Sequence, residues 1–309
     1  MAHFLVRRLG ILLVSLFFVI TLTFFMMKAL PAGPFSSEKN LPPAIMKNIE
    51  EKYHLNDPLW KQYVDHLGRV VRWDLGPSFK YPNRTVNEII NTGFPVSATI
   101  GALAVLLALV IGITAGVISA LWQNKFPDYF TMILATIGFS VPSFIFAGVL
   151  QYYLSYRWNL LPAAMWGKPA QMVMPVFSLS ALPTAVIARL MRAGMLEVLQ
   201  QDYIKTAKAK GLSARVTIYR HCLRNAIQPV VTYLGPLVAG IFTGSFVVEY
   251  IFTIPGLGRF FVMSIQNRDY TVIMGTTVFY SLFLMVMNLL VDFAYVIIDP
   301  RIKLVDRKG

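Results

Sequence analysis

Residues 192–229 read RAGMLEVLQQDYIKTAKAKGLSARVTIYRHCLRNAIQP, a basic and helix-forming segment that is punctuated by glycine. Strongly apolar runs lie on both sides of this segment, so it is a loop between two membrane spans. Short cytoplasmic loops of membrane proteins carry an excess of Lys and Arg. The segment therefore predicts a membrane protein in which the loop 191–228 faces the cytoplasm.

Composition supports a membrane protein. Hydrophobic residues make up 56% of the 309 residues and charged residues only 14%, whereas a soluble domain carries about 25% charged residues. The net charge of +13 is explained by basic cytoplasmic loops, and no Lys/Arg run is long enough to form a phosphate-binding arm, so a nucleic-acid partner is not expected. Cys222 is the single cysteine, and no His/Cys cluster predicts a metal site.

Six stretches are apolar and long enough to cross a membrane as helices, which takes about 20 residues. They lie at 9–29, 95–121, 129–156, 172–190, 229–252 and 274–298. We interpret Pro142, Pro175 and Pro183 as kinks, because neighbouring helices in a membrane bundle can satisfy the carbonyls that proline frees. The sequence thus predicts an all-α integral membrane protein with a single transmembrane domain over residues 1–309.

The distribution of basic residues predicts that both termini are cytoplasmic (N-in, C-in). With this orientation the cytoplasmic segments hold fifteen Lys and Arg residues, eight of them between Arg189 and Arg224, and the short external loops hold four. Arg7 and Arg8 precede the first apolar run, as in a secretory signal. That run is about 20 residues long, which is longer than a signal's apolar region, so we expect an uncleaved anchor.

The segment 31–94 is predicted to be a structured external loop, because helical patterns alternate in it with Pro and Gly stops. Two compatible interpretations remain open: a cap packed on the mouth of the bundle, and a docking platform for an external partner. The candidate partner contacts are aromatic: Tyr53, Trp60, Tyr63, Trp73 and Phe79.

A short helix is predicted inside the cytoplasmic loop. Asp202 is suited to be its N-cap, the helix then runs from Tyr203 to Lys210, and Gly211 suits a left-handed C-terminal residue. Small residues on this helix favour close insertion into the groove of a partner. Spacing alone leaves a second possibility, an amphipathic helix on anionic lipid.

The loop resembles the cytoplasmic motif of ABC importer permeases in the form used by the peptide-transport branch. That form reads ML-E-VL-x-x-DYI-x-TA-x-AKGL and then H-x-L-RNA-x-x-P. The matching positions are 195–199, 202–204, 206–207, 209–212, 221, 223–226 and 229. Lys205-Thr206-Ala207 stands where the generic motif has Glu-Ala-Ala, a departure that is usual in peptide-type permeases.

The resemblance extends to the N-terminal apolar helix, to residues 244–275 and to the ending at 295–300. In the external segment the chain is similar to the B-type permease of oligopeptide importers from Gram-negative bacteria. The resemblance implies a type I ABC importer permease fold of six transmembrane helices with a cytoplasmic coupling helix, in the bacterial inner membrane. It places the coupling to the ATPases on Glu197, Asp202, Tyr203, Thr206, Ala207, Ala209, Lys210, Gly211 and Leu212.

The partners implied by the resemblance are a second homologous permease, two ABC ATPase subunits, a periplasmic peptide-binding protein, the peptide cargo and the lipid bilayer. No Walker A pattern occurs in the sequence, so ATP and Mg²⁺ are expected on the ATPases and no cofactor on this chain. The chain is accordingly expected to be a transport subunit and not an enzyme.

The fifth predicted span directly follows the coupling loop, so we expect the gate of the pore there, with Ala239, Thr243 or Ser245 facing it. Related cargoes stay open: a dipeptide, a murein peptide, glutathione or nickel. An ion-coupled carrier is the rival class. It needs ionisable groups deep in the spans, whereas only Glu249 and Asp292 approach that position and both lie near a span end.

Overall fold

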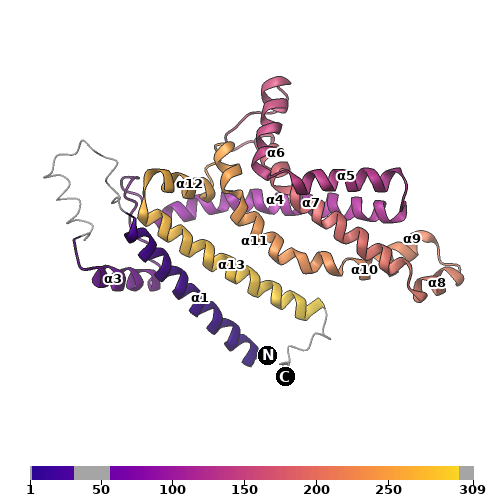
Figure 1. Ribbon diagram of the computed structural model, residues 1–309, viewed down its shortest axis with the longest axis horizontal. Coiled ribbons are helices and arrows are strands. Elements are labelled where there is room, and N and C mark those ends of the chain that lie inside the picture. Colours follow the sequence, from indigo (N-terminus) through magenta and orange to yellow (C-terminus); the bar gives the residue numbers. More distant parts are fainter. Residues whose placement is uncertain (1, 31–55, 299–309) are drawn as a thin grey trace. The chain divides into compact units, whose positions relative to one another are not determined.

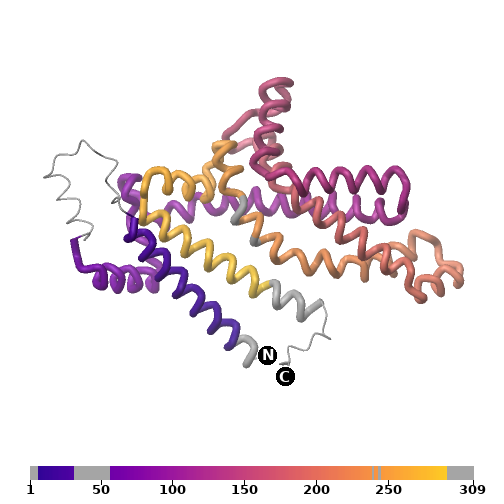
Figure 2. The backbone as a smooth tube through the Cα atoms, viewed as in Figure 1, coloured from indigo at the N-terminus to yellow at the C-terminus, as the bar shows by residue number. Residues whose placement is uncertain are grey.

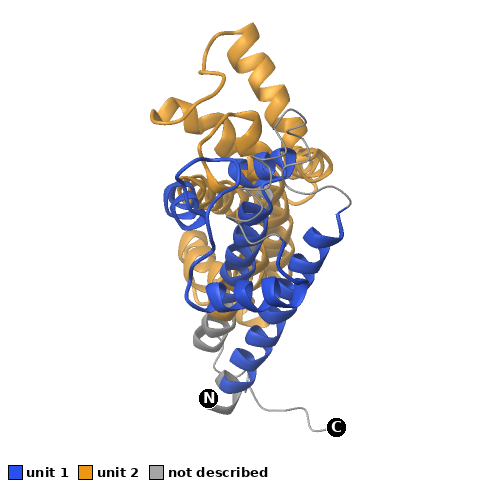
Figure 3. Ribbon diagram, turned by 90° about the vertical axis from the view of Figure 1, so that its left-hand side faces the viewer, with its two compact units in different colours: residues 1–95, 259–286, 304–309 blue, residues 96–258, 287–303 orange. Residues whose placement is uncertain are grey.

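The computed structural model describes residues 2–30 and 56–298, and their regular secondary structure is helical apart from one isolated β-bridge between Pro77 and Thr85. The chain forms two compact units (Figure 3). Unit 1 comprises residues 1–95, 259–286 and 304–309, and unit 2 comprises residues 96–258 and 287–303. The all-α prediction is confirmed for the described residues.

Unit 1 contains α1 (Ala2–Ala29), α3 (Leu59–Val71), the first turns of α4 (Val86–Leu121), most of α12 (Leu257–Asn267) and the first part of α13 (Tyr270–Ile298) (Figure 1). An aromatic cluster holds α3 against α1. The ring of Phe24 lies 5.3 Å from that of Tyr63 and 5.6 Å from that of His66. The hydroxyls of Thr21 and Tyr63 share a hydrogen bond of 2.7 Å.

The start of α4 is fixed by a capping box. The Thr85 hydroxyl accepts a hydrogen bond of 3.2 Å from the Glu88 backbone amide. The Glu88 carboxylate in turn accepts a hydrogen bond of 3.2 Å from the Thr85 backbone amide. The helix therefore begins at Val86, whereas the sequence predicts a start of the second span at Pro95. Pro95 lies inside α4. The end of the predicted external loop thus belongs to α4, and residues 31–55 of that loop lie outside the described residues.

Unit 2 is built around α7 (Pro169–Leu199), which packs against α5 (Phe126–Ser140), α6 (Ser143–Leu150) and α11 (Gln228–Ile251). Its buried core includes Ile100, Ile187, Met191 and Met195. Pro175 and Pro183 lie inside α7, which stays one helix as expected for a membrane bundle.

The prediction for Pro142 is wrong, because the helix stops there instead of bending slightly. The segments Phe126–Ser140 and Ser143–Arg157 meet at an angle of 105°, a turn that Figure 2 shows between the two magenta arms. Val141 has an extended backbone, φ −94° and ψ 118°, which is the conformation that a following proline favours. The last part of the second arm, Gln151–Arg157, is π-helical.

Four described helices are long and apolar enough to cross a membrane: Val6–Ala29, Val86–Leu121, Pro169–Leu199 and Tyr270–Leu290. The number rises to six if each of two bent pairs is one span, namely Phe126–Ser140 with Ser143–Arg157 and Ala214–Ala226 with Gln228–Phe242. The six predicted stretches therefore all fall on helices, while their orientation stays a prediction.

Candidate functional site

The cytoplasmic segment predicted from residues 192–229 is helical and lies at the end of α7 within unit 2 (Figure 1, right-hand side). After α7 come α8 (Asp202–Ala209), α9 (Ala214–Val216), a π-helical turn (Thr217–Cys222) and α10 (Leu223–Ala226), followed by α11. Only Gln200 and Gln201 separate α7 from α8. A displacement of α8 therefore acts almost directly on α7.

The C-terminus of α8 closes as predicted. Gly211 has φ +78°, its amide donates to the carbonyl of Lys208 at 3.0 Å, and the Leu212 amide donates to that of Ala207 at 3.3 Å. The N-cap prediction is wrong, because Gln201 takes that position and Asp202 is the first helical residue. The Asp202 carboxylate instead accepts a bond of 2.8 Å from Lys205.

One face of α8 is bound to the rest of the segment. The side chain of Ile204 is fully buried and that of Ala207 is buried, and α8 packs against the turn Thr217–Cys222. The Asn225 side-chain amide donates to the Tyr203 hydroxyl at 2.7 Å. The inner face thus holds α8 on its own chain, so the buried Ala207 contributes to this packing and not to the exposed face.

The other predicted coupling residues are exposed on α8 (Asp202–Ala209), on the last turn of α7 and in the turn that follows α8. Exposed residues are Glu197, Asp202, Tyr203, Thr206, Ala209, Lys210, Gly211 and Leu212. A cavity of about 540 Å³ adjoins these residues, and its lining includes Glu197, Gln201, Tyr203, Gln228 and Thr232. A helix that is anchored by its inner face, with small and polar residues outward and a hollow of mixed polar and apolar lining beside it, is suited to receive a protein partner.

Sequence reasoning missed an ion pair at the start of this segment, between the buried Asp128 and the partly exposed Arg192. The Arg192 guanidinium makes two bonds to the Asp128 carboxylate, from Nε at 2.7 Å and from Nη2 at 2.8 Å. Both residues fell just outside the ends of predicted spans. The sequence contained a signal for this pair. Asp128 lies at the start of one predicted span and Arg192 at the end of the next, so both lie at the same membrane surface.

The predicted gate residues are only partly described. The side chains of Ala239 and Thr243 lie outside the described residues, as does that of Asp292. Ser245 is buried within unit 2 and its hydroxyl donates to the Glu249 carboxylate at 2.7 Å. In this conformation Ser245 therefore faces the interior of its own unit, and the gate stays a prediction.

The fully buried side chain of Glu249 packs closely against the backbone of Gly256. A Cβ on Gly256 would lie 2.3 Å from its Oε2 atom. The nearby Leu257 amide donates to the Ser97 hydroxyl at 2.9 Å. These contacts tie the end of α11 and the following turn to α4 inside unit 2. They give the carboxylate a role in packing this turn.

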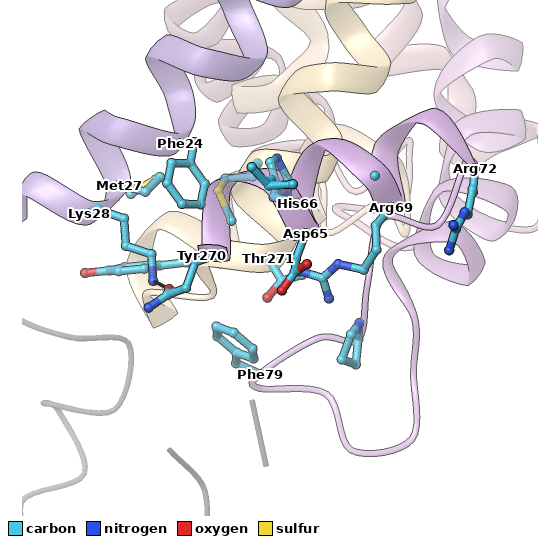
Figure 4. A pocket seen from close by; sticks show the side chains of 15 residues that line it. Phe24, Met27, Lys28, Asp65, His66, Arg69, Arg72, Phe79, Tyr270 and Thr271 are labelled. Carbon is cyan, nitrogen blue, oxygen red and sulfur yellow. Dashed lines mark hydrogen bonds between the residues drawn. The ribbon is translucent and has the colours of Figure 1, made fainter. Parts of the chain in front are cut away.

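Unit 1 contains a cavity of about 640 Å³ whose lining includes Phe24, Lys28, His66, Arg69 and Phe79. Figure 4 shows the ring of His66 beside that of Phe24, and the side chain of Arg69 beside that of Asp65. Burial, with smaller effects from the charges of Arg69 and Lys28, lowers the pKa of His66 to about 4. His66 is therefore neutral at physiological pH.

The aromatic residues predicted to meet an external partner fall into three groups. Trp60, 69% exposed, and Trp73 are on the surface. Tyr63 and Phe79 are half-buried, Tyr63 between Phe24 and Phe25, and Phe79 at the rim of the cavity. Tyr53 lies outside the described residues. Trp60 is thus the most accessible candidate.

Comparison with solved structures defines the class by its fold. The chain is similar to a solved amino acid ABC transporter with TM-score 0.55 and 15% identity, over 67% of this chain and 93% of that one. It is also similar to the inward-facing MetNI methionine ABC transporter with TM-score 0.56 and 14% identity, over 68% of this chain and 96% of that one. The fold is that of an ABC transporter membrane subunit.

Residues 112–304 match the family described as binding-protein-dependent transport system inner membrane component, and residues 1–101 match the N-terminal family of the same systems. The chain belongs to this family. It is an inner membrane permease of the ABC importer type, as the resemblance of its cytoplasmic segment implied.

Curated relatives match the chain over its whole length. The dipeptide transport system permease protein DppB of Bacillus subtilis is 50% identical over 309 residues, which is 100% of both chains. The oligopeptide transport system permease protein OppB is 46% identical in Haemophilus influenzae and 44% identical in Escherichia coli K12, in each case over 98% of this chain and 100% of the relative. The predicted likeness to peptide permeases is confirmed, and it includes both dipeptide and oligopeptide systems.

Proposed function

We propose that this chain forms half of the pore through which an ATP-driven importer brings peptides into the cytoplasm. The observation that carries the proposal is full-length similarity to dipeptide and oligopeptide permeases, at 44–50% identity. The geometry of the cytoplasmic segment supports it, because α8 combines a buried inner face with an exposed outer face of small and polar residues.

The partners of this importer are a second, homologous permease, two ABC ATPase subunits and an external peptide-binding protein. ATP and Mg²⁺ bind on the ATPase subunits, and this chain transmits the motion of those subunits through α8. The short connection of Gln200 and Gln201 supports such transmission, because a floppy linker would absorb a rigid-body displacement. Cargo selection rests mainly with the binding protein.

Reconstitution of the assembled complex in proteoliposomes tests this function. With the binding protein outside and ATP inside, we expect labelled dipeptides, tripeptides or pentapeptides to accumulate, and free amino acids to be excluded. The matched control carries an ATPase subunit that cannot hydrolyse ATP, and it should show no accumulation. Uptake driven by a proton gradient without ATP would identify an ion-coupled carrier and overturn the proposal.

The peptide path is proposed to follow α11, which leaves the cytoplasmic segment at Gln228. The gate is proposed at the residues predicted from sequence on this helix, Ala239 and Thr243. Trp at either position should block peptide uptake while the complex stays assembled. Full uptake by both Trp variants would move the gate to another helix.

A further inference from the structure

One carboxylate in unit 2, on α5, accepts hydrogen bonds from two other helices and one turn. Asp128, in the first turn of α5, is 2% exposed. Its oxygens accept both bonds from Arg192 of α7, one from the Asn124 amide at 2.9 Å, and one from the hydroxyl of Ser119 near the end of α4. All acceptor positions of the carboxylate that face the protein are therefore used by fixed groups.

The helices that meet at this carboxylate also approach one another closely. A Cβ on Gly116 of α4 would lie 2.6 Å from the Ala188 carbonyl oxygen of α7, and one on Gly112 would lie 2.8 Å from the Ile187 side chain. Glycine at these positions lets the two backbones touch. The α4–α5 hairpin is thus packed directly onto α7, and the ion pair fixes the position of α7 along it.

The place of Arg192 on α7 connects this junction to the coupling helix. Arg192 precedes the end of α7 at Leu199 by about two helical turns, and α8 begins at Asp202. A displacement of α8 therefore reaches the level of Arg192 through a continuous helix. At that level α7 either carries the α4–α5 hairpin with it or slides past it.

We propose that Asp128 and Arg192 are positioning residues that make the α4–α5 hairpin move as one body with α7 when an ATPase displaces α8. The inference rests on the proposed ATP-driven function. An arginine fork on a carboxylate has one preferred geometry and loses both bonds when the helices slide. The Asp128 side of the pair is buried, so little water reaches the carboxylate to replace the bonds that a slide would break, whereas Arg192 is 25% exposed.

The test measures the number of ATP molecules hydrolysed per peptide transported, in the full reconstituted complex. Asp128→Asn keeps the size of the side chain but offers an amide N–H to Arg192 in place of an acceptor. Arg192→Lys keeps the charge but cannot form the two-pronged bond. We expect both variants to assemble with the ATPases and to raise the ATP-to-peptide ratio by about five-fold or more, with Asp128→Asn the more severe.

Arg189→Gln is the matched control, because Arg189 lies one turn earlier on α7 and also contacts α5. Its guanidinium donates to the Thr136 hydroxyl at 2.9 Å and lies 5.2 Å from the centre of the Phe139 ring, in a more exposed position. We expect the wild-type ratio in this variant. A raised ratio here as well would overturn the assignment to the Asp128–Arg192 pair.

A merely stabilising pair would give a different result. Destabilised complexes lose ATP hydrolysis and uptake in proportion, so an unchanged ratio in Asp128→Asn and Arg192→Lys overturns the inference. If Asp128→Asn does not assemble, Arg192→Lys alone decides by the same criterion. A wild-type complex without ATP-driven peptide uptake would instead refute the proposed function, so the two failures are distinct.

Discussion

Gly211 ends α8, the proposed coupling helix, in a backbone conformation that side chains with a branched Cβ rarely adopt. Its φ is +78°, although no atom lies within 4 Å of a Cβ built there. A substitution at this position therefore acts through backbone strain and not through a steric clash. The left-handed conformation costs a residue with a Cβ about 1–2 kcal/mol. We expect Gly211→Val to reach the membrane normally but to lose ATPase association and peptide uptake.

Gly211→Asn is the control for this prediction, because Asn tolerates the left-handed conformation. It should retain association and uptake, measured by copurification of the ATPases and by transport in proteoliposomes. Normal uptake by Gly211→Val would mean that α8 is only a surface helix.

His66 gives the packing of α3 on α1 a defined pH dependence. Its pKa is lowered to about 4 in the folded protein, below the unfolded value of about 6.5. Above pH 6.5, His66 is neutral in both the folded and the unfolded state, and the packing has its full stability. As the pH falls from about 6.5 to 4, the unfolded state binds the proton first, so the packing loses up to about 3 kcal/mol.

Hydrogen exchange of α3 measures this effect. We expect faster exchange of α3 amides at about pH 5 than at pH 8, after correction for the intrinsic rate, and a smaller difference in His66→Phe, which cannot titrate. The same pH response in His66→Phe would assign the effect to another group.

At the scale of elements, α3 has a packing face and an exposed face, and the exposed face carries the candidate docking residue Trp60. Tyr63 and His66 face the ring of Phe24, whereas Trp60 is exposed. Aromatic anchors supply much of the affinity of protein interfaces. We expect Trp60→Ala to weaken binding of the external binding protein at least about ten-fold, by more than about 1.4 kcal/mol, while basal ATP hydrolysis persists.

Tyr63→Phe, which keeps the packed ring, is the control for Trp60→Ala. It should bind the partner as the wild type does, as measured by receptor-stimulated ATP hydrolysis. Undiminished stimulation in Trp60→Ala would show that α3 only caps the bundle.

The elements also show what the sequence determines. Hydropathy located the six helical stretches, and Gly211 marked the end of α8, because both signals are local. The signal for the early start of α4 is also local, because Thr85 and Glu88 form a capping box. A search for apolar spans does not detect this signal. Pro142 and Pro183 look alike in sequence, yet Pro142 breaks its helix and Pro183 does not. Both are prolines within apolar stretches, so hydropathy and the presence of a proline do not distinguish a break from a continuous helix.

The geometry of the candidate coupling site was predictable to a similar extent. The residue pattern located α8 and its small exposed residues. The burial of Ala207 and the bonds of Asp128 to Arg192 depend on contacts between segments far apart in the chain. Such contacts follow only from the three-dimensional arrangement.

At the scale of the whole molecule, the orientation in the membrane depends on the broken pair α5–α6. If this pair is one span, residues 158–168 are external and both termini are cytoplasmic; if it is re-entrant, every later segment is inverted. We expect a reporter that is active only in the periplasm to be active after Asn159 and inactive after Lys308. Activity after Lys308 would contradict the assigned topology.

The central claim is that α8 docks an ATPase, and a crosslink from its outer face tests it most directly. A photo-crosslinking residue in place of Thr206, which is exposed on α8, should attach to an ATPase subunit in the assembled complex. The same residue in place of Trp60 serves as the control and should not attach to that subunit. Attachment of the Thr206 position to lipid alone, in a complex that still transports peptide, would contradict the account.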